Sequence, residues 1–407
     1  MMKIRFASLI LFIHLSSNSF GQKLLQKLTI TSLFEMVDSA SINKNGLILG
    51  IGESVHGAKE FNELRFSLLE KSSPIKFSCM AIEMPFHINL DLFDFLNNPN
   101  SSISVDSIIR KIDFFYLKTE EFKRELIILR ENNNNTSIKN NIVGIDIQNL
   151  KANLELFDKS VLIQKSFVAD KDIAELREII AKRRYNEKKE KNNFLNKIEN
   201  LKKTVGDGSV CLKMYSEIER KFLIRLIEII PYSYTLNEFM LNKNILAATN
   251  YRDSIMFENT IWAINLFSGN IILAAHNGHI SKINYEEPSL KTVGGYLSSQ
   301  TKFQYIPVGV DFKIGKFVAK KMNEDKVSVF ELIQLKRRDI YEQFQIDNGF
   351  YFTTTSIFGE NKKIEIHDIG ASYNPENNSL AFIKIIPKKC FDFIILFNKA
   401  SSPKLIE

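Results

Sequence analysis

Ionisable side chains gather where apolar segments of this chain end, and their types suit proton transfer. The first apolar segment runs directly into Gly52-Glu-Ser-Val-His-Gly57. Later segments end in a similar way, and the seven candidate side chains are Glu53, His56, Glu83, Asp146, Gln148, His276 and His279. A carboxylate within reach of an imidazole is a common arrangement for general acid–base catalysis. The pattern therefore predicts an acid–base site.

Short apolar runs predict the strands that would carry these side chains. They are Leu47–Ile51, Met80–Ile82, Ile142–Ile147, Ile271–Ala275, Tyr305–Val310 and Phe393–Phe397. Apolar strands that alternate with helices are typical of an α/β fold with a mainly parallel sheet covered by helices. The strand ends that precede helices then lie at one edge of the sheet, where ligands bind. We therefore expect the seven side chains to meet at one crevice.

Three parts are expected after the N-terminal residues 1–21. Residues 22–149 would form the first part of the α/β core, and residues 150–269 a long helical insertion that forms a wall of the cleft. Residues 270–407 would complete the core and add a smaller C-terminal α+β portion. Within the insertion, Lys151–Lys203 and Leu212–Ile230 predict long amphipathic helices, separated by a turn at Gly206-Asp-Gly208.

The N-terminal residues 1–21 are typical of a secretory signal peptide. Lys3 and Arg5 precede an apolar run over 6–15, and a mostly polar segment follows, with cleavage expected after Gly21. The alternative is a membrane anchor, although the run is shorter than the ~18 residues that a spanning helix needs. We expect export to the periplasm or the medium, with no stable membrane insertion after cleavage.

Two arginines fall on helix faces that should be buried. Arg65 lies between Phe61 and Leu69 on the apolar face of its helix, where it needs an acidic partner such as Glu53 or Glu83. The alternative is that Arg65 reaches water from the edge of the face. On a later helix, Arg252 and Asn259 also lie on a packed face, and bracing of the insertion is favoured over contact with the cleft.

Several other chemistries find no support in the sequence. It has no Gly-rich phosphate loop, no Gly-x-Ser-x-Gly motif, and its three cysteines, Cys79, Cys211 and Cys390, lack metal-ligand spacing. The basic run over 182–203 mixes both signs of charge, which indicates a solvated helix and no nucleic-acid partner. Two options remain: a His/Glu site that activates water, or a metal site built from Glu53, His56, His276 and His279.

The same residues resemble the erythromycin esterase family. The matching motifs are Gly52-Glu-Ser-Val-His-Gly57, Glu63-Leu-Arg65, Ala81-Ile-Glu83, Gly144-x-Asp-x-Gln148, Arg252-Asp-x-x-Met-x-Glu-Asn259 and Ala275-His-Asn-Gly-His279. The resemblance implies a hydrolase that opens the macrolactone ring of macrolide antibiotics, as in antibiotic resistance, or cleaves another small-molecule ester. It also implies a reaction without cofactor, metal or covalent acyl-enzyme.

The resemblance further implies a role for each matching residue. His56 would be the general base that activates water, Glu53 and Glu83 would orient the catalytic groups, and Arg65 would hold the carboxylates or assist at the oxyanion. His276 would be a second essential histidine. Substrate binding is expected of His279, Asp146, Gln148 and Arg252. A metal-dependent hydrolase or peptidase, and a non-catalytic binder of a large apolar ligand, remain the alternatives.

Overall fold

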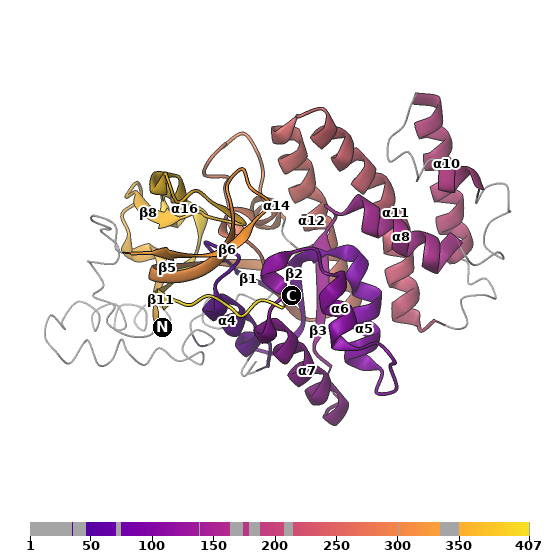
Figure 1. The fold of residues 1–407 in the computed structure, drawn as a ribbon, viewed down its shortest axis with the longest axis horizontal. Coiled ribbons are helices and arrows are strands. Elements are labelled where there is room, and N and C mark those ends of the chain that lie inside the picture. The colour runs from indigo at the N-terminus through magenta and orange to yellow at the C-terminus, as the bar shows by residue number, and fades with distance from the viewer. Residues whose placement is uncertain are drawn as a thin grey trace, which may run out of the picture.

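A computed structural model describes residues 35, 46–70, 75–137, 139–162, 174–178, 188–206, 215–300, 302–333 and 350–406 (Figure 1). The expected signal peptide, Cys211 and most of the turn expected at Gly206-Asp-Gly208 lie outside these residues. Within them, no helix is long and apolar enough to cross a membrane. Cys79 and Cys390 are buried free thiols.

A nine-stranded sheet forms the centre of the molecule. Its main path runs β3 (Asn141–Asp146), β2 (Phe77–Pro85), β4 (Asn270–Ala274), β1 (Leu47–Ile51), β5 (Gln304–Lys321), β11 (Phe393–Ala400) and β7 (Phe350–Thr354), while β6 (Val327–Leu332) and β9 (Ser372–Tyr373) pair with β5. The six strands from β3 to β11 are parallel to their neighbours, and β7 and β6 are antiparallel. The predicted fold class is confirmed, and each of the six predicted strands is present.

Both faces of the parallel region are buried. In β1, Leu47, Leu49 and Ile51 enter one apolar core, and Ile48 enters the other. Side chains of a strand alternate between faces, so a strand buried on both sides has to be apolar throughout. Helices α4 (Lys59–Glu70), α5 (Asn89–Asn97), α6 (Val105–Lys111) and α7 (Glu120–Asn135) pack on one face, and the helices after β3 pack on the other (Figure 1).

Helices make up the described residues between β3 and β4. They are α8 (Leu150–Phe157), the π-helical turn Asp158–Leu162, a short helical piece at 174–178, α10 (Lys188–Gly206), α11 (Glu217–Leu241) and α12 (Ile245–Phe267). The prediction of one helix over Lys151–Lys203 was wrong. Arg177 Nε lies 2.6 Å from Asp158 Oδ1, whereas residues 19 positions apart in one helix would be about 28 Å apart. The second predicted helix instead begins at Glu217, where Ser216 forms a capping box, and it continues past Pro231. Packing against α8, α10 and α12 outweighs the helix-breaking tendency of that proline.

The C-terminal portion adds two features to the sheet. The two-stranded sheet of β8 (Ile364–His367) and β10 (Phe382–Ile385) stands beside it, and β5 continues beyond the predicted Val310 to Lys321. The segment after β8 returns to the tip of β1, where the backbone of Ile369 donates to the carbonyl of Ser54 over 2.9 Å. A part of the chain more than 300 residues away in sequence therefore lies against the first motif.

Candidate active site

The tip of β1 and helix α4 build a buried chain of three side chains. Arg65 Nη2 lies 2.6 Å from Glu53 Oε2, and Glu53 Oε1 lies 2.7 Å from His56 Nδ1. Burial raises the pKa of Glu53, but Arg65 and His56 outweigh it and hold the pKa below its ordinary value. Glu53 is thus a carboxylate that accepts the His56 Nδ1 proton, which leaves the lone pair of the neutral ring on Nε2.

Close backbone contacts fix this loop. A Cβ at Gly57 would lie 1.9 Å from the carbonyl oxygen of Val318, so only glycine permits β5 to approach here. The His56 ring stacks on Tyr116, with centroids 4.2 Å apart and planes 11° apart. Tyr116, from the 3-10 turn Phe115–Leu117, was missed by the sequence reasoning because that turn gives no strand-end signal. These contacts hold the imidazole in one orientation.

Arg252 of α12 gathers the carboxylates at the ends of β2 and β3. Its Nη2 lies 2.6 Å from Glu83 Oε1 and 2.6 Å from Asp146 Oδ2. The side-chain oxygen of Gln148, in the orientation that satisfies its hydrogen bonds, accepts from Arg252 Nε over 2.6 Å. Burial opposes the charge of Arg252, but Asp146 and Glu83 prevail and raise its pKa well above the ordinary value. Burial also opposes ionisation of Glu83, yet His279, His56 and Arg252 hold its pKa well below the ordinary value.

His279 joins this network through Asp253, which lies 2.6 Å from its Nδ1. Burial lowers the pKa of His279, but the carboxylates of Asp253 and Glu83 raise it to about 10. Arg252 Nη1 lies 2.9 Å from Nε2, a contact that requires an unprotonated Nε2 because a guanidinium can only donate. The raised pKa and this contact imply different protonation states of Nε2. We favour the raised pKa because two carboxylates face the ring, and Glu83 Oε1, 3.5 Å from Nε2, can accept its second proton.

His276 begins the short helix α13 (Asn277–Ile280), and both of its ring nitrogens are engaged. Nδ1 accepts from the Gly278 backbone over 3.3 Å, and Nε2 lies 3.4 Å from the Ser54 carbonyl and 3.5 Å from Asp368. Burial lowers the pKa of His276, so the ring is neutral with its proton on Nε2. Its backbone N–H donates to Glu83 Oε2 over 3.0 Å. The His276 ring centroid lies 5.3 Å from that of His56.

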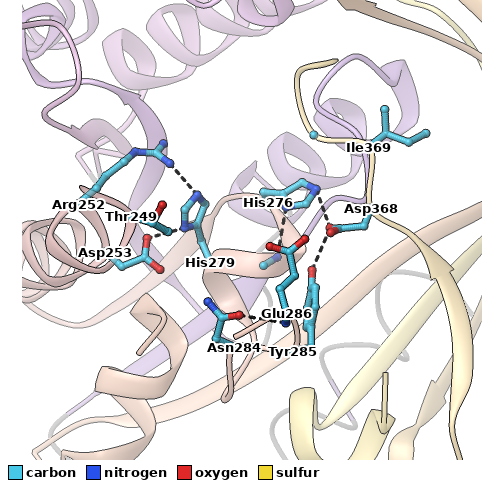
Figure 2. A pocket seen from close by; sticks show the side chains of 12 residues that line it. Thr249, Arg252, Asp253, His276, His279, Asn284, Tyr285, Glu286, Asp368 and Ile369 are labelled. Atoms are coloured by element: carbon cyan, nitrogen blue, oxygen red, sulfur yellow. Dashed lines mark hydrogen bonds and ion pairs between the residues drawn. The ribbon is translucent and has the colours of Figure 1, made fainter. Parts of the chain in front are cut away.

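A cavity of about 330 Å³ opens beside these networks. Figure 2 shows Arg252, Asp253 and His279 on one side, and His276, Asp368 and Tyr285 on the other. Its lining residues are Thr249, Arg252, Asp253, His276, Gly278, His279, Asn284, Tyr285, Glu286, Asp368, Ile369 and Gly370. It is a polar cavity in which cationic, anionic and imidazole groups face the same space.

All nine candidate site residues lie in two networks. One is the chain from Arg65 through Glu53 to His56, and the other is centred on Arg252 and Glu83 and includes Asp146, Gln148, His276 and His279. Arg65 pairs with Glu53, one of its two predicted partners, and its side chain is 2% exposed, so it does not reach water. Arg252 reaches the cavity, whereas bracing was favoured for it. Asn259 does brace α12, because its amide donates to the Ile145 carbonyl over 2.7 Å.

Residues from three further places complete the cavity. Asp253, Tyr285, Glu286 and Asp368 were missed by the sequence reasoning. A signal existed for one of them, because Asp253 follows Arg252 directly.

Three of the candidate residues could also hold a metal ion. One ligand atom each from Glu53, His56 and Glu83 lies within 4.8 Å of the others. His276 and His279, which the sequence reasoning placed in such a site, are not part of this group. Both oxygens of Glu53 already contact His56 and Arg65, so an ion would have to displace a short hydrogen bond and sit near a guanidinium. The donor set therefore fits a resident cation poorly.

Known structures share this fold. A Bacillus cereus protein is similar at 18% identity with a TM-score of 0.72, covering 94% of each chain. A succinoglycan biosynthesis protein is similar at 17% identity with a TM-score of 0.68, covering 93% of this chain and 92% of that one. A histidine-to-asparagine mutant of erythromycin esterase EreC, in its open conformation, is similar at 18% identity with a TM-score of 0.67, covering 94% and 97%. No curated protein matches the sequence.

The sequence also matches a known family directly. Residues 76–400 match the erythromycin esterase family. This range contains Glu83, Arg252, His276 and His279. The Glu53–His56 motif and Arg65 precede the matched range. The chain belongs to the erythromycin esterase family and is an ester-hydrolysing enzyme that acts on a small molecule.

Proposed function

We propose that this enzyme hydrolyses its ester through a water molecule activated by His56, without a metal ion or a covalent intermediate. The observation that carries the proposal is the buried chain from Arg65 through Glu53 to His56. A carboxylate that accepts from Nδ1 fixes the tautomer in which Nε2 is basic, and it stabilises the imidazolium that forms when Nε2 takes a proton.

The reaction proceeds in two steps. His56 Nε2 takes a proton from water as the water oxygen forms a bond to the ester carbonyl carbon, and the carbonyl electron pair moves onto oxygen. The tetrahedral intermediate then collapses, the bond to the alcohol oxygen breaks, and the imidazolium returns its proton to that oxygen. His56 suits this role better than His276, whose Nδ1 lone pair already accepts from Gly278.

Stabilisation of the oxyanion falls to residues that line the cavity. Arg252 and His276 do so, whereas Arg65 is enclosed with Glu53. A cationic or N–H group beside the developing negative charge lowers the barrier most when water is excluded. We therefore assign Arg65 to holding Glu53, and Arg252 together with His276 to the substrate carbonyl. Glu83 connects Arg252 and His276, because it accepts from Arg252 Nη2 and from the His276 backbone N–H.

The substrate we propose is a carboxylic ester, with macrolide macrolactones as the first candidates. Membership of the erythromycin esterase family and similarity to the EreC fold support this choice. The test is incubation of the purified enzyme with macrolides and simple esters, followed by mass spectrometry. Gain of one water by a macrolactone supports the proposal, and turnover confined to simple esters would reject the macrolide assignment.

His56→Ala and Glu83→Ala variants test the catalytic assignment on any ester that is turned over. Both should fold, as judged by circular dichroism, and both should lose hydrolysis. Glu63→Gln is a suitable control, because Glu63 belongs to the same loop–helix unit and its half-exposed side chain lies 3.6 Å from Lys59, away from His56 and Glu53. A folded His56→Ala enzyme with full activity would refute the proposed role of His56.

A metal-dependent hydrolase is the second candidate, because Glu53, His56 and Glu83 come close enough to share an ion. Elemental analysis of the purified protein and activity after dialysis against a chelator separate the two candidates. Unchanged activity after chelation supports the first. Loss of activity that zinc or manganese restores would establish the second.

We also propose that the enzyme is exported, on the basis of the N-terminal segment 1–21. Expression with this segment should yield protein in the periplasm or medium, with Gln22 as its first residue. N-terminal sequencing of the recovered protein tests the cleavage site. Recovery only in the cytoplasm with Met1 retained would reject export.

A further inference from the structure

The segment Asp368–Gly370 touches both histidine-bearing loops of the active site. The Ile369 backbone donates to the Ser54 carbonyl over 2.9 Å, and the His56 backbone donates to the Gly370 carbonyl over 3.2 Å. Asp368 Oδ1 lies 3.5 Å from His276 Nε2. One short segment after β8 therefore holds the loop of His56 by its backbone and the ring of His276 by its side chain.

Glycine at position 370 suits the backbone conformation of this segment. Its φ of +58° lies in the left-handed region, which residues with a side chain rarely adopt, whereas a Cβ there would only make an ordinary contact with His276 Nε2 at 4.0 Å. The segment forms a parallel bridge with the β1 tip at Val55. The position of Asp368 relative to the two histidines is thus set by backbone contacts on both sides.

Asp368 is a partly buried carboxylate with defined neighbours. Its Oδ1 accepts from the Tyr285 hydroxyl over 3.0 Å, and its side chain is 13% exposed at the cavity wall (Figure 2). Tyr285 fixes the carboxylate, and the carboxylate in turn faces the Nε2 proton of His276. Because the Ser54 carbonyl, at 3.4 Å, is the other acceptor at Nε2, that proton is held by two long contacts. Such contacts shorten in reacting complexes of many enzymes.

We propose that Asp368 is a positioning residue that acts on the reaction through His276. It holds the imidazole at the cavity wall through the Nε2 proton, and because the contacts to Asp368 and Ser54 are long, that proton can turn to the ester oxygen when substrate binds. The kinetic part of this inference rests on the function proposed above, whereas the structural part does not. Asp368 contacts His276, Tyr285 and the Glu286 side chain, and we expect its effect on kcat only while His276 is present.

A double-mutant cycle tests the kinetic part. Asp368→Asn retains the shape of the side chain and an acceptor for Tyr285 but removes the charge. We expect kcat to fall about 10- to 100-fold, within the range of a partly lost acid–base contribution, with KM changed less than threefold. In a His276→Asn background, the same change should reduce kcat less than threefold. Asp325→Asn, at a position whose side chain is 92% exposed, is the matched control. Equal effects in both backgrounds would overturn the proposal.

A measurement without substrate keeps the two proposals separable. In the ¹⁵N-histidine NMR spectrum, the signal that disappears in His276→Asn belongs to His276. We expect its Nε2 proton to be visible in the parent enzyme, and to shift or broaden in Asp368→Asn but not in Asp325→Asn. An Nε2 proton signal that Asp368→Asn leaves unchanged would overturn the inference even if esters are hydrolysed. A changed signal in a protein that hydrolyses no ester would support the structural part and count against the proposed function alone.

Discussion

Two arginine-centred networks lie at one edge of the same sheet, and they differ in exposure and in the number of carboxylates. The Arg65 side chain is 2% exposed and pairs with one carboxylate, Glu53, which in turn serves one histidine. The Arg252 side chain is 14% exposed, pairs with Glu83 and Asp146, and lines the cavity. A closed network suits the setting of a base, and an open one suits contact with substrate.

The comparison also explains why each arginine tolerates its position. A buried guanidinium is costly unless its charge is matched and its hydrogen bonds are made. The charge of Arg65 is matched by one short ion pair, and its Nη1 donates to Asn62 over 3.3 Å, although its buried Nε makes no hydrogen bond within the described residues. Removal of Arg65 leaves the Glu53 charge without a cation. Arg252 retains access to water and shares its charge among several acceptors. The same residue type is therefore more structural at position 65 and more functional at position 252.

The closed network is most sharply tested by neutralising its carboxylate. Glu53→Gln keeps the size of the side chain but removes the charge that stabilises the His56 imidazolium. We expect kcat to fall by about 10³- to 10⁴-fold, the loss typical when a histidine base loses its carboxylate. Steady-state kinetics beside Glu63→Gln measure it, and a decrease below tenfold would mean that Glu53 does not serve the base.

Removal of Arg65 should show the structural side of the closed network. Arg65→Met leaves a buried, unpaired Glu53 carboxylate, and we expect the free energy of unfolding to fall by about 3–5 kcal/mol. Arg124→Met, at a position with 53% side-chain exposure, should change it by less than about 0.5 kcal/mol. Urea denaturation compares the two. An equally small decrease in the free energy of unfolding for both substitutions would mean that Arg65 has no structural role.

Arg252 should behave in the opposite way. Arg252→Lys keeps the charge but loses the planar fork that binds Glu83 and Asp146 together. We expect kcat/KM to fall about 10- to 100-fold, while the free energy of unfolding decreases less than in Arg65→Met. Kinetics and urea denaturation on the same preparation test this prediction. If Arg252→Lys lowered the free energy of unfolding more than Arg65→Met does and left kcat/KM unchanged, the roles of the two arginines would be reversed.

The open network also predicts a small dependence of stability on pH. The folded-state pKa of His279, raised to about 10 by Asp253 and Glu83, exceeds the value near 6.5 of an unfolded histidine. Its contribution to stability is therefore full below about pH 6.5 and is lost as pH rises toward 10. His279→Asn should flatten the decline of the melting temperature between pH 7 and 9.5. An unchanged slope in this variant would mean that His279 is neutral in the folded protein.

The strand ends show how far a sequence predicts such a site. Glu53, Glu83, Asp146 and His276 were located because parallel strands carry their terminal residues to one edge. The burial of Arg65 followed from helical periodicity, and its partner was one of two carboxylates named in advance. The regular parts of an α/β fold impose this order, so spacing alone was informative.

The missing residues lie where periodicity carries no such information. Tyr116 stands in a 3-10 turn, and Tyr285 and Glu286 stand in the irregular segment after α13. Asp368 reaches the site because its segment returns to β1 across most of the chain length. Long-range contacts of irregular segments depend on the packing of the whole molecule, which local spacing does not encode. The extent of α11 past Pro231 escaped prediction for the same reason.

The most direct test of the account is the hydrolysis of one ester substrate by the parent enzyme and by His56→Gln. Mass spectrometry should show gain of one water by the parent reaction. The folded His56→Gln enzyme should yield at least about 10³ times less product in the same time, because water then lacks its base. A folded His56→Gln enzyme that retains activity within tenfold of the parent would contradict the central claim.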